Sequence, residues 1–312
     1  MKVASVTVNY KTADLALRAV EAALADLEPL GGKAFLVDND SGDGSLERLR
    51  QGIADRGLGD RVELIASPRN VGFGAGNNLA FRAALASDDP PEYFYLINPD
   101  AKPDAGAVRV LVDFMDAHPS VGIAGSRVRH PSGEVRHSAF RFPSVVSELE
   151  AGLHVSLASK LLERWRVPAE PPTRTGPVDW VSGASVVLRT AMLHDIGMFD
   201  ENFFLYYEET DLCLRAARAG WTTWYVLESE AEHIGQVSTG MKDRAKPRPR
   251  FWFESRAYYL RKNYGPLTLL AANAAFASAY SVYEMRKRLG KPEVDPPGFY
   301  RDFLRFNFAR KK

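Results

Sequence analysis

Two acidic segments, about a hundred residues apart, carry the side chains best suited to chemistry in this chain. Residues 96–100 form a short apolar run that ends in the carboxylate of Asp100. Residues 206–212 place Glu208, Glu209 and Asp211 at the start of a predicted helix. A carboxylate at a strand end can hold a divalent cation, and one at a helix start can accept a proton. Such a pair would serve the transfer of a group from a metal-bound diphosphate to a hydroxyl.

Apolar runs alternate with segments of helical periodicity, which predicts an α/β fold with a mostly parallel sheet and helices on both faces. Ligands of such sheets bind beyond the carboxyl ends of the strands. Asp38, Asn70 and Asp100 each follow a predicted strand, so one crevice could gather them. The predicted strands are 3–8, 34–37, 62–66, 93–97, 121–124, 178–188 and 224–227. The predicted helices are 13–27, 46–54, 78–85, 107–117, 149–165 and 209–219.

The composition bounds the class of protein. The chain has 312 residues, which fits one large domain or one domain with an appendage, and its 46% hydrophobic content supports a real core. Its single cysteine, Cys213, cannot form an internal disulfide, and the N-terminus shows no signal-peptide pattern. We therefore expect a cytoplasmic protein.

The charge is unevenly distributed. Residues 241–312 contain 17 Lys/Arg and 6 Asp/Glu, a net charge of +11, whereas the rest of the chain carries −10. Such a tail suits anionic lipid or nucleic acid, or it packs against the acidic body. The apolar run 267–283 is too short and polar for a membrane span, and aromatic and basic residues interleave at 299–306. These features favour a peripheral membrane surface, with an ordinary helical cap as the alternative, and we expect no nucleic-acid partner.

Each candidate residue also has a purely structural interpretation. Asn-Pro-Asp at 98–100 is a common turn, and acids at a helix start favour the helix dipole. Asp211 can pair with Arg215 one turn later. A lone histidine such as His233 is usually structural. The glycines at 72, 74 and 76 do not match the dinucleotide-binding spacing and could simply permit close packing.

Eight short motifs in order resemble glycosyltransferase family 2, which has the GT-A fold, and within it the rhamnosyltransferase-like branch. They span roughly residues 3–240 and are Val8-Asn9-Tyr10, Val37-Asp38-Asn39, Asn70-Val71-Gly72-Phe73 with Asn78, Asn98-Pro99-Asp100, Trp180 to Ala184, Gly197 to Glu201, Tyr207 to Cys213, and His233. The resemblance implies an inverting transfer of a sugar from a nucleotide diphosphate to a hydroxyl, with Mg²⁺ or Mn²⁺ as cofactor. L-Rhamnose from dTDP-rhamnose is the best single expectation, with UDP-linked sugars open.

The resemblance also implies roles for residues. Glu209 matches the general base, and Asp100 would hold the cation with His233 as a further ligand. The expected donor-binding residues are Asn9, Asp38, Asn70, Gly72, Asn78, Asp100, Trp180 and Gly183. From its composition alone, the polar, basic and proline-containing run 236–250 is expected to form a mobile loop that closes over the donor, with Lys242 or Arg244 near the phosphates.

Two departures from the family pattern matter. Glu209 stands where Asp is usual, so Glu208 could share or take over the role of base. The metal motif carries one carboxylate fewer than Asp-x-Asp, which implies weaker metal binding and makes His233 more important as a cation ligand. We expect residues 1–125 to bind the nucleotide sugar, 126–240 to form the acceptor and catalytic half, and 241–312 to be the loop and a basic helical extension.

The expected acceptor is a glycan or a polyprenyl-linked hydroxyl of the cell envelope, at the inner face of the membrane. Three alternatives remain. A sugar nucleotidyltransferase would share the fold and the cation without needing an acceptor base. An inactive sugar-nucleotide-binding protein would likewise not depend on an acceptor base. A nicotinamide oxidoreductase is a distant third alternative.

Overall fold

The computed structural model of the protein describes residues 1–168, 170–235 and 245–309. It divides into two compact units. The sheet unit comprises residues 1–140, 170–204 and 208–239, and the helical unit comprises 141–169, 205–207 and 240–312. Most of the expected donor-covering loop, including Lys242 and Arg244, lies outside the described residues.

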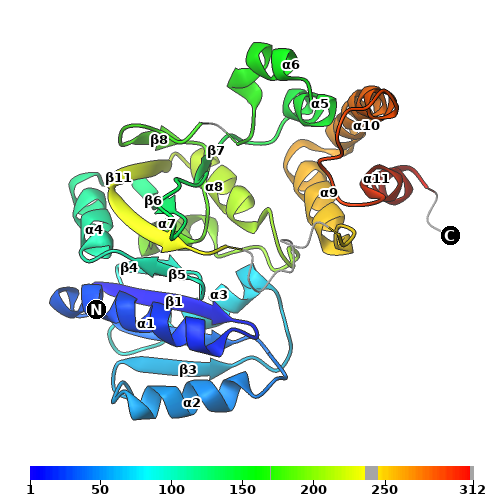
Figure 1. Ribbon diagram of the computed structural model, residues 1–312. Helices are drawn as coiled ribbons and strands as arrows, with labels where there is room; N and C mark the ends of the chain where they lie inside the picture. The colour runs from blue at the N-terminus through cyan, green and yellow to red at the C-terminus, as the bar shows by residue number, and fades with distance from the viewer. Residues whose placement is uncertain (169, 236–244, 310–312) are drawn as a thin grey trace. The chain divides into compact units, whose positions relative to one another are not determined.

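The sheet unit is built on a nine-stranded sheet within the described residues, in the order β3-β2-β1-β4-β10-β6-β11-β5, with β8 added alongside β11 (Figure 1). Strands β1 to β4 run parallel, β10 runs antiparallel to both of its neighbours, and β6 and β11 are parallel. The strands are β1 (Val3–Asn9), β2 (Lys33–Asp38), β3 (Val62–Ala66), β4 (Tyr93–Ile97), β5 (Ala101–Pro103), β6 (Val121–Arg129), β8 (Gly176–Val178), β10 (Ser185–Arg189) and β11 (Thr222–His233).

Helices cover both faces of this sheet, as the alternating pattern predicts. They are α1 (Ala13–Leu27) with the 3₁₀ turn η1 (Glu28–Leu30), α2 (Ser45–Asp55), α3 (Phe73–Leu85), α4 (Ala107–Ala117), α7 (Thr190–Ile196) and α8 (Glu208–Arg218). A separate two-stranded ribbon joins β7 (Ala139–Phe140) to β9 (Trp180–Val181). The α/β fold class is confirmed.

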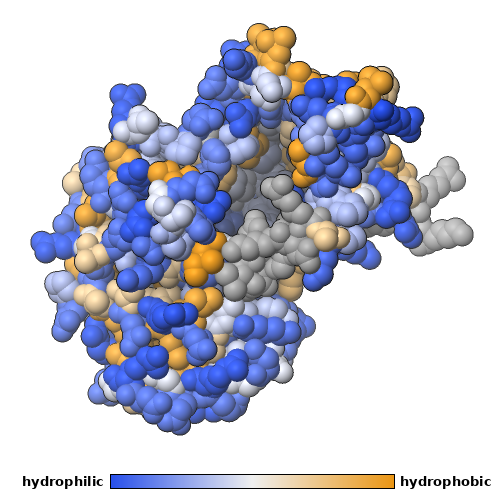
Figure 2. All heavy atoms as spheres, in the orientation of Figure 1, coloured by the Kyte–Doolittle hydropathy of each residue, from blue (hydrophilic) through white to orange (hydrophobic). Residues whose placement is uncertain are grey.

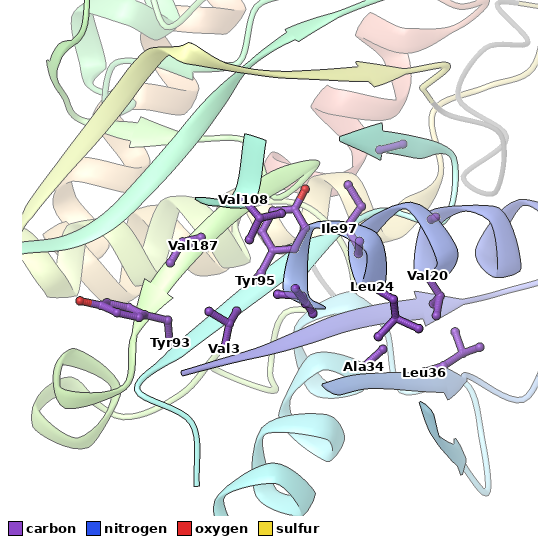
Figure 3. Packing of buried hydrophobic residues seen from close by; sticks show 14 of the residues in the cluster. Val3, Val20, Leu24, Ala34, Leu36, Tyr93, Tyr95, Ile97, Val108 and Val187 are labelled. Carbon is purple, nitrogen blue, oxygen red and sulfur yellow. The ribbon is translucent and has the colours of Figure 1, made fainter. Parts of the chain in front are cut away.

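The core follows from the period of two along the strands, because every second side chain faces the same side. Leu24 of α1, Ala34 and Leu36 belong to one buried cluster, which Figure 3 shows together with Tyr95 and other residues of β4 and α4. On the other face, Phe81 of α3 packs against Phe94 of β4 with ring centroids 4.4 Å apart. A sheet buried on both faces explains why its strands are almost continuously apolar.

The helical unit contains α5 (Val145–Leu153), α6 (Ser156–Leu161), the 3₁₀ turn η2 (Glu163–Trp165), α9 (Arg250–Tyr264), α10 (Pro266–Arg288) and α11 (Phe299–Phe308). Its aromatic core includes Phe253, Phe276 and Tyr280. A buried ion pair joins Arg256 of α9 to Glu148 of α5 at 2.8 Å, and Arg256 also donates to Asn273 of α10 at 2.7 Å. The expected C-terminal helical extension is therefore present.

Several element boundaries differ from the sequence prediction: α3 begins at Phe73 instead of residue 78, β6 ends at Arg129 instead of residue 124, and three further elements differ more. The expected helix 149–165 is broken because His154 adopts a left-handed conformation (φ 47°). The expected strand 178–188 is three short strands that join different neighbours. The last strand continues past residue 227 to His233, because a register shift between Val226 and Glu230 lets its polar end pair with β6 and β5.

The helical unit also bears on the membrane prediction. Among the described residues, no helix combines the length and the apolar composition that crossing a bilayer requires.

Candidate active site

The carboxyl ends of β1 and β2 bring Asn9 and Asp38 together, because these two residues are partners in the parallel register. Asn9 Nδ2 donates to Asp38 Oδ1 at 2.7 Å, and Ser41 Oγ donates to the same oxygen at 2.6 Å. Asn9 Oδ1 accepts from the Thr12 amide at 3.1 Å. Asp38 is buried, so its carboxylate holds the loop after β2 in shape around the expected nucleotide site.

A second amide network joins this loop to the one after β3. Asn39 Nδ2 donates to Asn70 Oδ1 at 3.0 Å and to the carbonyl of Gly72 at 3.1 Å, and its Oδ1 accepts from the Val71 amide at 3.1 Å. Gly72 has φ 86°, and a Cβ there would overlap the backbone carbonyl of Phe204. A glycine is therefore required at position 72, because the backbone of Phe204 passes too close for any side chain. Asn39 and Ser41 are site-forming residues that the sequence prediction did not select.

Asn78 lies elsewhere. Its Nδ2 donates to the Phe199 carbonyl at 2.9 Å and to Glu201 Oε1 at 3.0 Å, while its Oδ1 accepts from the Phe199 amide at 3.1 Å. The hydrogen bond from Asn78, followed by the one from Arg82, lowers the pKa of Glu201. The structure therefore does not bring Asn78 into the Asn9–Asp38 network but uses it to fasten the segment at 199–201.

The acid and the histidine expected to hold a cation are in contact. His233 Nε2 lies 3.1 Å from Asp100 Oδ1 and 3.4 Å from Asn98 Nδ2, and the Ile234 amide donates to the Asp100 carbonyl at 3.0 Å. The antiparallel pairing of β5 with β11 sets His233 opposite Ala101, directly after Asp100. Two residues 133 apart in the chain thus share one sheet edge.

The donor set around Asp100 suits a hard divalent cation. Asn98 Oδ1 is buried, and no hydrogen-bond partner for it lies among the described residues. In that same part of the chain, no three His, Cys, Asp or Glu side chains cluster closely enough to form a metal site by themselves. Mg²⁺ commonly takes only one or two protein carboxylates and completes its shell with substrate phosphates and water. One carboxylate, one amide oxygen and one imidazole fit that pattern.

Glu208 and Glu209 point in different directions from the first turn of α8, as residues 100° apart on a helix must. Glu208 is fully buried beside Gly74 of α3, and its Oε2 accepts no hydrogen bond from any residue in the described ranges. Glu209 is half-buried, and its Oε1 accepts from the Gly183 amide at 3.2 Å. A Cβ on Gly183 would lie 2.9 Å from that oxygen, so glycine permits this contact.

Both glutamate pKa values are raised. Burial is the main cause for each, and for Glu208 the neighbouring negative charge of Glu209 raises the pKa further. A mostly apolar void of about 10 Å³ borders Glu209 on its inner side, next to Leu96 and Leu212. Hydrogen bonds from its own amide and from Gly183 partly oppose the shift for Glu209. Burial and the charge of Glu209 therefore make Glu208 the member of the pair that more readily keeps a proton.

The third acid of the cluster has a structural role. Asp211 is fully buried and accepts from Arg215 Nε at 2.9 Å, which confirms the i,i+4 pairing expected from the sequence. Arg215 also donates to the carbonyls of Ile196 and Met198 at 2.7 and 2.8 Å. This pair anchors α8 to the segment before it.

Hydrogen bonds and one peptide link connect Glu209 to Asn98, His233 and Asp100. Glu209 is bonded to the Gly183 amide, and the next residue, Ala184, accepts from the Asn98 amide at 3.2 Å. Asn98 in turn contacts His233, which contacts Asp100. Strand pairing of Ile97 with Ser185 fixes this connection. Gly183, which contacts Glu209 of α8, and Asn98, which contacts His233 of β11, thus flank the paired ends of β10 and β4.

Trp180 lies on β9, two residues before the turn that leads to Gly183. Its ring stacks on Phe140 of β7, with centroids 4.2 Å apart and planes 15° from parallel. The stacked pair closes off the ribbon beside Gly183 and gives that turn a fixed aromatic wall.

The fold and these residues define a class of enzyme, the GT-A glycosyltransferases. Among solved structures, the chain resembles a mannosyltransferase from Pyrobaculum calidifontis that was determined with GDP-mannose and Mn²⁺. The two share 14% sequence identity and a TM-score of 0.53 over 99% of this chain and 84% of the other. At that identity the likeness concerns the fold alone.

Sequence comparison is more specific. The model of "Glycosyl transferase family 2" matches residues 5–152. An N-acetylglucosaminyl-diphospho-decaprenol L-rhamnosyltransferase from Mycobacterium tuberculosis is 30% identical over an alignment of 217 positions, and the match covers 66% of this chain and 67% of the relative. Rhamnosyltransferase WbbL from Escherichia coli is 24% identical over 165 residues, 52% of this chain and 60% of the relative. The protein belongs to glycosyltransferase family 2 and is rhamnosyltransferase-like.

Proposed function

We propose that this glycosyltransferase moves L-rhamnose, with inversion, from a nucleoside diphosphate donor such as dTDP-rhamnose to a hydroxyl of a polyprenyl-diphosphate-linked glycan. The choice of sugar and acceptor is supported by the names of the two relatives above. The observation that carries the chemistry is the hydrogen-bonded connection from Glu209 through Gly183, Ala184 and Asn98 to His233 and Asp100.

In this mechanism Glu209 takes the proton from the acceptor hydroxyl. The acceptor oxygen forms a bond to the anomeric carbon of the donor sugar, and the bond from that carbon to the diphosphate oxygen breaks. The nucleoside diphosphate leaves with the electron pair, and the proton stays on Glu209. A base whose pKa is raised toward neutrality is well matched to a hydroxyl at physiological pH.

Asp100, His233 and Asn98 Oδ1 would hold Mg²⁺ or Mn²⁺ together with the donor diphosphate. Such a cation neutralises negative charge that develops on the leaving group. The chain's own part is to fix the ligands: β5 and β11 hold His233 against Asp100, and the bond from the Asn98 amide to Ala184 sets the direction of the turn at 98–100.

The role of Glu208 in this proposal is to stay protonated. It is buried next to Glu209 and its pKa is raised well above the usual range, so it does not compete for the substrate proton. This division of roles favours Glu209 over Glu208 as the base, a choice that the sequence leaves open.

A transfer assay tests the proposal. The purified protein is incubated with dTDP-rhamnose or with UDP-glucose, with polyprenyl-diphosphate-linked N-acetylglucosamine, and with Mn²⁺ or EDTA. We expect a product heavier by one deoxyhexose with dTDP-rhamnose only, lost with EDTA, and with inverted anomeric configuration by NMR. Transfer from UDP-glucose instead would refute the donor, and absence of any transfer would refute the reaction. A nucleotidyltransferase would instead release pyrophosphate from a nucleoside triphosphate and a sugar phosphate.

A further inference from the structure

The large apolar side chains that are exposed gather in one part of the described chain. All of them except Phe204 and Ile234 lie in the helical unit. Leu289 and Leu267 are the extremes, at 87% and 81% exposure. Single exposed leucines are ordinary on protein surfaces, but a concentration of this kind marks an interaction site.

Helix α10 carries most of this surface as one stripe. At 100° per residue, its exposed apolar residues fall within about 60° on either side of Leu267. They are Leu267, Leu270, Val282 and Met285 within the helix, followed by Leu289 at its C-cap. We call these five residues the α10 stripe. Small residues, Ala274 and Ser278, occupy the same face between its two ends.

The opposite face of α10 is buried within the helical unit. It packs against α5, where a Cβ on Gly152 would come within 2.8 Å of the Phe276 carbonyl. Tyr280 and Tyr283 are buried on that side. The α10 stripe is therefore not needed by the fold of the helical unit, and Figure 2 shows apolar side chains over one end of α10 and over α6.

Positive charge flanks the α10 stripe at both ends. Arg261 and Lys262 are exposed in the last turn of α9, just before it, and Arg288 and Lys291 are exposed beside Leu289. The one acid of α10, Glu284, bonds to Lys287 at 3.0 Å. Apolar residues bordered by cations complement an anionic lipid surface, which accepts the apolar groups at the acyl boundary and attracts the cations.

We propose that the helical unit docks on an anionic lipid bilayer through the α10 stripe, with α10 lying in the plane of the interface. The inference rests on the proposed function, because a polyprenyl-linked acceptor resides in a membrane. A second copy of the chain is a poorer occupant. A two-fold contact would bring the same basic ends of two α10 helices together, with like charges facing each other.

Vesicle flotation of the full chain without substrates tests this inference. Vesicles of phosphatidylcholine alone are compared with vesicles that contain phosphatidylglycerol, at low and at high salt. We expect the protein to float with the anionic vesicles only, and binding to fall with added salt. Absence of flotation with anionic vesicles, or equal binding to neutral ones, would overturn the proposal.

Matched variants locate the surface. Leu267→Ser combined with Leu289→Ser should weaken vesicle binding about tenfold or more, because both side chains would leave the acyl boundary. The control, Val294→Ser with Phe308→Ser, removes apolar side chains that are exposed off the stripe and should bind like the native chain. If the control loses binding and the stripe variant keeps it, the assignment to α10 is wrong.

Two further measurements separate this inference from the transfer reaction and from self-association. Glu209→Gln should bind vesicles like the native chain, and the stripe variant should keep full transfer to a short, water-soluble acceptor. The stripe variant and its control should both have the native melting temperature, since the residues changed in them are exposed. If sedimentation finds a native dimer that the stripe variant converts to monomer, a second copy covers the stripe and the lipid proposal is overturned.

Discussion

Replacing Glu209 with glutamine removes the proton acceptor and leaves its anchor in place. The amide oxygen of glutamine can still accept from the Gly183 N–H, which lies 3.2 Å from Oε1 in the native chain. The replacement also fills the same volume beside Phe73 and Gly183. Fold and donor binding should therefore be kept, and only the proton transfer should be lost.

The expected loss follows from what a positioned general base contributes. That contribution is about 10²–10⁴-fold in rate, or about 3–5 kcal/mol of activation free energy. We expect kcat to fall by this factor, while KM for the donor and the donor-induced rise in melting temperature stay within about twofold of native. A discontinuous transfer assay with separately measured donor binding gives both quantities.

The pH profile supplies an independent check. Transfer requires ionised Glu209, whose pKa is raised above the usual glutamate range, so native activity should fall as pH decreases through that raised value. The residual activity of Glu209→Gln should lack this acidic limb. The reasoning is refuted if Glu209→Gln retains near-native kcat, or if Glu208→Gln abolishes transfer and Glu209→Gln does not.

Three further predictions concern other residues. Asp100→Asn should raise the Mn²⁺ concentration needed for half-maximal activity by about tenfold or more, since the site keeps one charge fewer; an unchanged titration would show that Asp100 is not a ligand. For Glu208→Gln, we predict that the melting temperature of the variant minus that of the native chain becomes more positive as pH rises from about 5 to 9. The native chain keeps the stability linked to protonated Glu208 at low pH and loses it as pH rises through the raised pKa; parallel curves would contradict this. Arg256→Met should destabilise the fold by about 3–5 kcal/mol in urea unfolding because Glu148 is left buried without its partner, and recovery with Glu148→Leu would confirm the cause.

Local pattern was enough to predict the fold and the turn that carries Asp100. Strand β4 before it is buried along its whole length, so its apolar run stands out, and Asp100 follows three residues later. The end of β11 was harder, because Glu230 and Glu232 interrupt the apolar pattern. Both glutamates form ion pairs with arginines of the neighbouring strand β6; Arg129, for example, bonds to Glu232 at 2.7 Å. His233 therefore belongs to a strand that the sequence alone ends six residues too early.

Long-range partners account for the remaining differences. Asn78 belongs to the family motif, but its partner Phe199 is 121 residues away, and no local signal identifies that contact. Asn39 and Asn98 stand inside recognised motifs. Their importance comes from amide hydrogen bonds to other loops, which spacing along the chain does not encode. The choice between Glu208 and Glu209 needed burial, which depends on where α3 packs.

The hydrogen bond from the Gly183 amide to Glu209 limits which parts of this scaffold can change without moving Glu209. Gly183 lies just before β10, and because a Cβ there would crowd Glu209 Oε1, the orientation of Glu209 depends on this glycine and on the path of the backbone. The same strand is hydrogen-bonded to β4, whose end bears Asn98. The pairing of Ile97 with Ser185 therefore ties the turn that contacts Glu209 to the turn that bears Asn98 and Asp100. New donor or acceptor preferences can then arise in the surrounding loops without disturbing the catalytic spacing.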